Sequence, residues 1–201
     1  MGKLCKRVSL CFVLAAFVWA GTLIADRQRL NEELIRLHVV ANSDSEADQS
    51  LKLRVRDAVT ESLQDDLSKL GDVEEAKAYL RESLPKIQAV ANEALAAAGC
   101  DDRAVVTLCK EVFDTRHYDT FSLPAGIYES LRIVIGNGQG HNWWCVVFPS
   151  LCLPAASDGF EAEAASAGFP DRLTGALQGE EYQLRFFMLD VLGRAQTLVG
   201  E

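Results

Sequence analysis

The stretch ELIRLHVVANSDSEADQ (residues 33–49) contains a change of hydrophobic period that decides the fold class. Between residues 35 and 39 apolar side chains alternate with polar ones, which is typical of a strand with one buried face. The polar run that follows ends the strand and starts a helix. Within it, Ser43 and Glu46 have the spacing of a capping box, and acidic residues crowd the first turn.

Two long helices are predicted after this point. Apolar residues recur at helical spacing from Ser45 to about Leu70, where Gly71 closes the first helix. A second helix is predicted over Val73 to Gly99. We expect Pro85 to break and restart it, because proline lacks the amide hydrogen that an inner turn needs.

Short β-branched runs follow at residues 103–113, 128–136 and 143–148. The last two are separated by the glycine loop GNGQGHN (residues 136–142), which favours an antiparallel hairpin of residues 131–135 with 143–148 at the centre of a sheet. The predicted class is therefore α+β: an antiparallel sheet with two long helices packed on one face, preceded by an N-terminal hydrophobic helix.

The N-terminus has the pattern of an export segment. Lys3, Lys6 and Arg7 precede an uncharged apolar run, residues 8–25, as in a secretory signal or an uncleaved membrane anchor. The expected organisation is a signal or anchor at 1–25, an exported domain at 30–153, a linker rich in Ala, Gly and Glu at 154–179 and a C-terminal segment at 180–201. A net charge of −9 without a basic stripe argues against nucleic acid as a partner.

Catalytic signatures are weak. His141 and Cys145 lie close in sequence, but in one strand they would be about 13 Å apart, beyond the reach of a nucleophile and its base. The chain has no G-x-S-x-G, no H-E-x-x-H and no P-loop, and no metal or cofactor is expected. A cell-envelope peptidase that uses Cys145 and His141 is kept as an alternative.

The adjacent tryptophans favour binding instead. Trp143 and Trp144 must point to opposite faces of their strand, so one is expected in the core and the other on the second face, beside the glycine loop. An exposed aromatic of this kind is typical of a hot spot for a protein partner. The predicted partner-binding residues are Pro124, Gly126, Tyr128, Gly140, His141, Asn142, Trp143 and Trp144.

Four cysteines lie outside the export segment, and an oxidising location permits disulfides between them. A turn at Pro149 could bring Cys145 to Cys152, which is the pairing that we hypothesise. Cys109 with Cys145, across neighbouring strands, is the competing pair.

The two blocks HVVANSDSEADQSLKLRVRDAV (residues 38–59) and PAGIYESLRIVIGNGQGHNWWCVVFPSLC (residues 124–152) resemble the stage II sporulation protein R family of endospore-forming bacteria. The resemblance implies a protein that is exported from the forespore into the space between the two membranes. There it would activate a membrane-embedded aspartic protease that processes the precursor of sigma factor E. The chain itself would not be an enzyme. A non-signalling envelope adaptor is a further alternative.

Overall fold

The computed structural model describes residues 31–117 and 122–149, with scattered positions between residues 7 and 28. The described elements follow one another as β1 (Ile35–Val40), α2 (Glu46–Leu67), α3 (Val73–Ala97), β2 (Ala104–Phe113), β3 (Arg116–His117), β4 (Ser122–Leu123), β5 (Gly126–Ile135) and β6 (Asn142–Phe148). The predicted linker at 154–179 and the segment at 180–201 lie outside the described residues.

The four long strands form one mixed sheet in the order β2-β5-β1-β6, and β3 with β4 forms a separate two-stranded ribbon. β1 is parallel to β5 and antiparallel to β6, while β2 and β5 are antiparallel. The α+β class is thus confirmed, but the prediction of a wholly antiparallel sheet is wrong.

The predicted hairpin is also wrong. Residues 131–135 and 143–148 are strands of the same sheet, but β1 lies between them and β6 is at the sheet edge. The loop at residues 136–141 therefore passes across the end of β1 instead of making a tight turn. Nearly every residue of β1 is buried, on both faces, which suits an inner strand with neighbours on each side.

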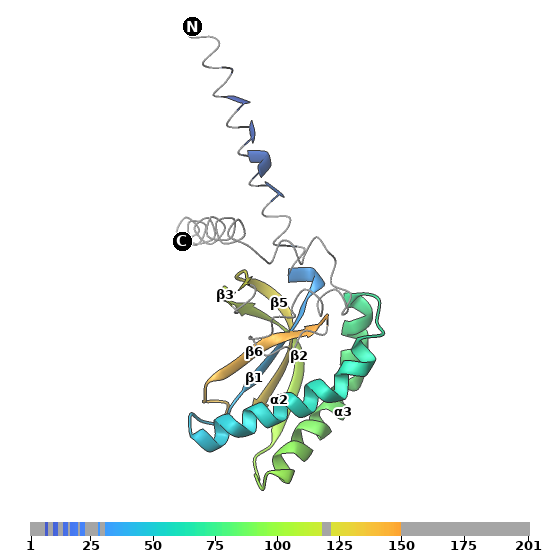
Figure 1. Ribbon diagram of the computed structural model, residues 1–201, viewed down its shortest axis with the longest axis vertical. Coiled ribbons are helices and arrows are strands. Elements are labelled where there is room, and N and C mark those ends of the chain that lie inside the picture. Colours follow the sequence, from blue (N-terminus) through green and yellow to red (C-terminus); the bar gives the residue numbers. More distant parts are fainter. Residues whose placement is uncertain are drawn as a thin grey trace, which may run out of the picture.

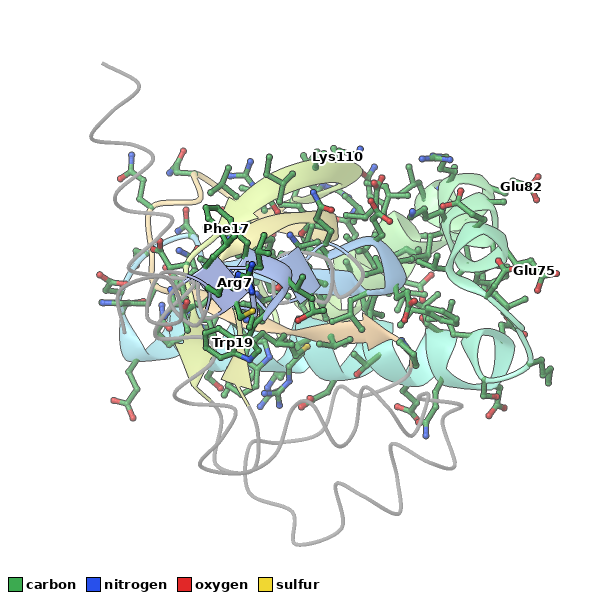
Figure 2. The ribbon with its side chains drawn as sticks, turned by 90° about the horizontal axis from the view of Figure 1, so that it is seen from above. Arg7, Phe17, Trp19, Glu75, Glu82 and Lys110 are labelled. Carbon is green, nitrogen blue, oxygen red and sulfur yellow. The ribbon has the colours of Figure 1, made fainter. Side chains whose placement is uncertain are left out.

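Both helices cover one face of the sheet and lie against each other (Figure 1). On this face β1 contributes Ile35, Leu37 and Val39, all fully buried as the alternating pattern predicts. The opposite sides of the helices are polar, and Glu75 and Glu82 point from α3 away from the sheet (Figure 2). The helix side chains buried against the sheet or each other include Val55, Val59, Leu63, Leu67, Leu80, Ile87, Ala91 and Leu95.

The helix ends differ from the sequence prediction in two places. The N-cap of α2 is Ser45, whose hydroxyl accepts from the amide of Asp48, so the predicted capping box of Ser43 and Glu46 is wrong. Helix α3 continues through Pro85 without the predicted break. Pro85 is exposed, and the burial of neighbouring turns of α3 in the core stabilises the helix on either side of it.

Most of the predicted export segment lies outside the described residues. In the part of the chain that the structure does describe, no helix combines the length and the apolar character that a membrane span requires. The signal peptide or anchor therefore stays a prediction.

Candidate functional site

Two loops that are distant in sequence meet at one end of the sheet. One connects β1 to α2 (residues 41–45) and the other connects β5 to β6 (residues 136–141). The amide of Gly140 donates to the carbonyl oxygen of Ala41 at 2.9 Å, and the amide of Gln139 donates to that of Asn42 at 3.1 Å. These two loops are called the loop pair below.

Polar side chains of the loop between β1 and α2, together with Asp48 in the first turn of α2, fix the loop pair. Asn42 accepts a hydrogen bond from the amide of Asn137 at 2.9 Å, and its own amide group donates to Asp48 at 3.2 Å. The hydroxyl of Ser43 donates to the same carboxylate at 2.5 Å. This bond from Ser43 is the largest cause of a lowered pKa at Asp48, so Asp48 stays ionised at neutral pH.

The glycines of the second loop let the two backbones approach each other. Gly136 has φ +55°, a conformation that favours glycine, and lies against the side chain of Asn42. A Cβ at Gly140 would overlap with the carbonyl oxygen of Ser43. Gly140 is one of the predicted partner-binding residues, and its close neighbours in the structure are Ser43 and Ala41 of the other loop.

His141, at the end of the loop pair, contacts two other segments. Its amide and its ring Nδ1 lie 2.6 Å and 2.5 Å from Oδ1 of Asp44, while its carbonyl oxygen accepts from Nζ of Lys52 at 3.0 Å. The pKa of Asp44 is lowered, chiefly by the backbone hydrogen bond from His141. The side chain of His141 is nevertheless 80% exposed, and the next residue, Asn142, is exposed as well.

Lys52 is unusual because its side chain is buried, with only 5% of the residue exposed. Its ammonium also donates to Oε1 of Gln49 at 2.5 Å. Desolvation lowers the pKa of Lys52, and the carboxylate of Asp44 partly opposes that effect. A buried cation is costly unless it is paired or hydrogen-bonded. Gln49 satisfies the ammonium from within α2, and the bond to the carbonyl oxygen of His141 connects α2 to the loop pair.

The two tryptophans point to opposite faces of β6, as predicted. Trp143 packs against the helix-covered core, with the guanidinium of Arg56 4.2 Å from its ring. Trp144 lies on the other face, stacked on His38 at 5.5 Å with Arg116 3.8 Å from its ring. Both are half-buried, so the expected contrast of one core and one exposed tryptophan is not present.

The predicted residues Pro124, Gly126 and Tyr128 lie at the far end of the sheet from the loop pair. Tyr128 is fully buried, and its hydroxyl donates to the carbonyl oxygen of Pro124 at 2.7 Å. Glu129, the residue after Tyr128, is paired with Ile35 of β1. Ile35 is in turn paired with Phe148, the last residue of β6, whereas Asn142 is the first residue of β6. The structure therefore does not bring these residues together with His141 and Asn142.

The cysteines are only partly described. Cys100 and Cys109 are free thiols, so the competing pair Cys109–Cys145 is wrong. Cys145 is buried and is not among the free thiols. Cys152 lies outside the described residues, and its pairing with Cys145 stays a prediction.

Asp44 and Lys52 were not among the predicted site residues, although both lie in the first block of family resemblance (residues 38–59). The signal was present for Lys52, because it precedes Val55, Val59 and Leu63 at helical spacing and so belongs to the apolar stripe of α2. A lysine in such a stripe indicates a buried cation with a specific contact. Asp44 had no comparable signal, since its partner is 97 residues away.

Comparison with known proteins identifies a sporulation protein. The family model described as stage II sporulation protein R matches residues 31–158, and the chain belongs to this family. A relative from Bacillus subtilis (strain 168), stage II sporulation protein R, is 41% identical over 128 residues, which are 64% of this chain and 57% of the relative. The chain thus spans little more than half of that relative's length. No solved structure matches this chain.

Proposed function

We propose that this protein is an exported signal of sporulation that activates a membrane-embedded aspartic protease, which then processes the precursor of sigma factor E. Family membership supports the role in sporulation. The observation that carries the signalling role is the loop pair: it holds His141 and Asn142 exposed in a fixed geometry, as a preorganised recognition surface requires. The proteolytic chemistry belongs to the partner.

The peptidase alternative has less support. His141 lies in the loop pair with its ring nitrogen on Asp44, whereas Cys145 is buried in β6 and faces the helix-covered core. Replacement of Cys145 by Ser would remove all turnover from a Cys-dependent peptidase. A signal would retain its effect as long as the variant folds.

Reconstitution tests the proposal directly. The chain, the membrane protease and the sigma-factor precursor are produced together in a host that does not sporulate, and precursor cleavage is followed by immunoblot. We expect cleavage only when all three are present. A matched chain that lacks residues 1–25 should stay inside the producing cell and fail to activate. Absence of cleavage with a folded, exported wild-type chain would contradict the proposal and favour the adaptor.

Within this assay, His141→Ala and Asn142→Ala should each reduce activation at least about thirtyfold, the factor expected for truncation of a hot-spot residue. Both side chains are exposed, so export and thermal stability should stay close to wild type. Full activation by both folded variants would place the recognition surface elsewhere.

A further inference from the structure

His141 uses all but one of its polar atoms inside the protein. The backbone amide and ring Nδ1 are held by Asp44, and the backbone carbonyl is held by Lys52. Ring Nε2 has no hydrogen-bond partner among the described residues, and the side chain is 80% exposed. The ring is therefore fixed in orientation with a single polar atom available to another molecule.

The contact with Asp44 also decides where the ring proton lies. The lowered pKa of Asp44 keeps it a carboxylate at neutral pH, and a carboxylate can only accept hydrogen bonds. Nδ1 must then carry the proton that is donated to Oδ1. In the neutral imidazole Nε2 is consequently the nitrogen with a free lone pair, which is a hydrogen-bond acceptor.

We infer that Nε2 of His141 accepts a hydrogen bond from a basic side chain, Arg or Lys, of the partner. The surroundings favour a cation, because Asp44 is exposed beside the ring and Glu46 and Asp48 follow at the start of α2. The nearby ammonium of Lys52 is buried below the loop and is occupied by Gln49 and the His141 carbonyl. This inference rests on the proposed function.

Lys52 is assigned as the positioning residue of this contact. It does not reach the surface, but its ammonium fixes the peptide group between His141 and Asn142, the two exposed residues. Asp44 fixes the same residue through the amide of the preceding peptide group and through the ring. Lys52 and Asp44 thus fix both the position and the orientation of Nε2.

Replacement of His141 by Asn or by Gln tests the role of Nε2 separately from that of Nδ1. The shorter side chain of Asn places its amide near the position of Nδ1, where it can still donate to Asp44, but nothing occupies the position of Nε2. Gln reaches the position of Nε2 with an oxygen that accepts. In the reconstituted cleavage assay we expect His141→Gln to stay within about threefold of wild type and His141→Asn to lose at least about tenfold.

His141→Lys is the discriminating control, because Lys donates and carries the charge that a basic partner would repel. It should be inactive. The inference is overturned if the Lys variant activates, or if the folded Asn variant equals or exceeds the Gln variant. Failure of wild type in the same assay instead removes the proposed function, so the two failures are distinguishable.

Imidazole nitrogen NMR of the exported protein is an independent test. It should show Nδ1 of His141 protonated, and Asp44→Asn should change that spectrum. Protonation at Nε2 alone would also overturn the inference.

Discussion

The loop that follows β5 (residues 136–141) is largely exposed and held by polar contacts, whereas Tyr128, near the start of β5, is buried against an aromatic ring. At the loop pair, Asp44 and Lys52 fix His141 through hydrogen bonds, and the ring stays in solvent. At the other end, the ring of Tyr128 is fully buried, 5.8 Å from that of Phe113. Both ends come from the same block of sequence.

The buried end is stabilised around an arginine. The guanidinium of Arg36 lies 4.1 Å from the ring of Phe113 and 5.2 Å from that of Tyr128, and Arg36 is itself fully buried. Such an arrangement contributes through packing and cation–π attraction. One end of the block thus serves the fold, while the other is the surface that we propose for a partner.

The largest expected effect on stability is at the buried end of β5, around Tyr128. Tyr128→Ala removes a fully buried ring and should lower the free energy of unfolding by about 3–5 kcal/mol, as measured by chemical denaturation. Val112→Ala is the matched control on the adjacent strand: Val112 is 80% exposed, and its loss should cost no more than about 0.5 kcal/mol. If Tyr128→Ala kept wild-type stability but lost activation, Tyr128 would belong to the recognition surface after all.

A smaller effect is expected where the two loops touch. In Gly140→Ala the new Cβ meets the carbonyl oxygen of Ser43, so the loops must separate, at a cost of about 1–3 kcal/mol. Hydrogen exchange should show weaker protection at the amides of Gln139 and Gly140, which donate across the loop pair. Gly71→Ala is the control, because the nearest atom to its Cβ is at an ordinary contact distance of 3.6 Å. Unchanged protection in Gly140→Ala would mean that the loops are not coupled.

The smallest effect on stability, within about 1 kcal/mol, is expected for Lys52→Met, which replaces a buried cation by an apolar side chain of similar length. Activation should nevertheless fall several-fold, because the carbonyl of His141 loses its donor. Lys69→Met, at an exposed lysine, should change neither quantity. Wild-type activation by Lys52→Met would remove Lys52 from its positioning role.

The pH dependence of stability sharpens this comparison. Burial lowers the pKa of Lys52 below its ordinary 10.5, so the charged form is disfavoured in the folded state. As pH rises through the folded pKa towards 10.5, the folded state releases its proton before the unfolded state does. Wild type should therefore gain stability relative to Lys52→Met in that window, as measured by denaturation at fixed pH values. A parallel response of the two proteins would show that desolvation of the ammonium is unimportant.

Much of the local structure could be predicted from sequence, because it depends on contacts within a few residues. The period-2 pattern located β1 and its buried face, and the spacing of Val55, Val59 and Leu63 located the inner face of α2. Gly99 was predicted to end the second helix, and it does so with φ +73°. The opposite directions of Trp143 and Trp144 followed from strand geometry alone.

Local signals were less reliable for caps and breaks. Ser43 and Ser45 are both suitable N-caps, and the choice of Ser45 leaves Ser43 free to hold Asp48. Pro85 carries the sequence signal of a helix break, but burial of Leu80 and Ile87 on either side keeps α3 continuous. In both cases packing and contacts beyond the immediate turn outweighed the local preference.

The sequence was sufficient to locate the two helices and the four long strands, their apolar faces, and the blocks that resemble a sporulation family, but not the short strands β3 and β4. The position of β1 between β5 and β6 is known from the three-dimensional structure alone, since an alternating pattern fixes the buried face of a strand but not its neighbours. This position of β1 brings the loop before α2 against the loop that follows β5, so Asp44 contacts His141, which is 97 residues away in the sequence. Long-range pairing of this kind depends on the packing of the whole domain, which no local pattern records.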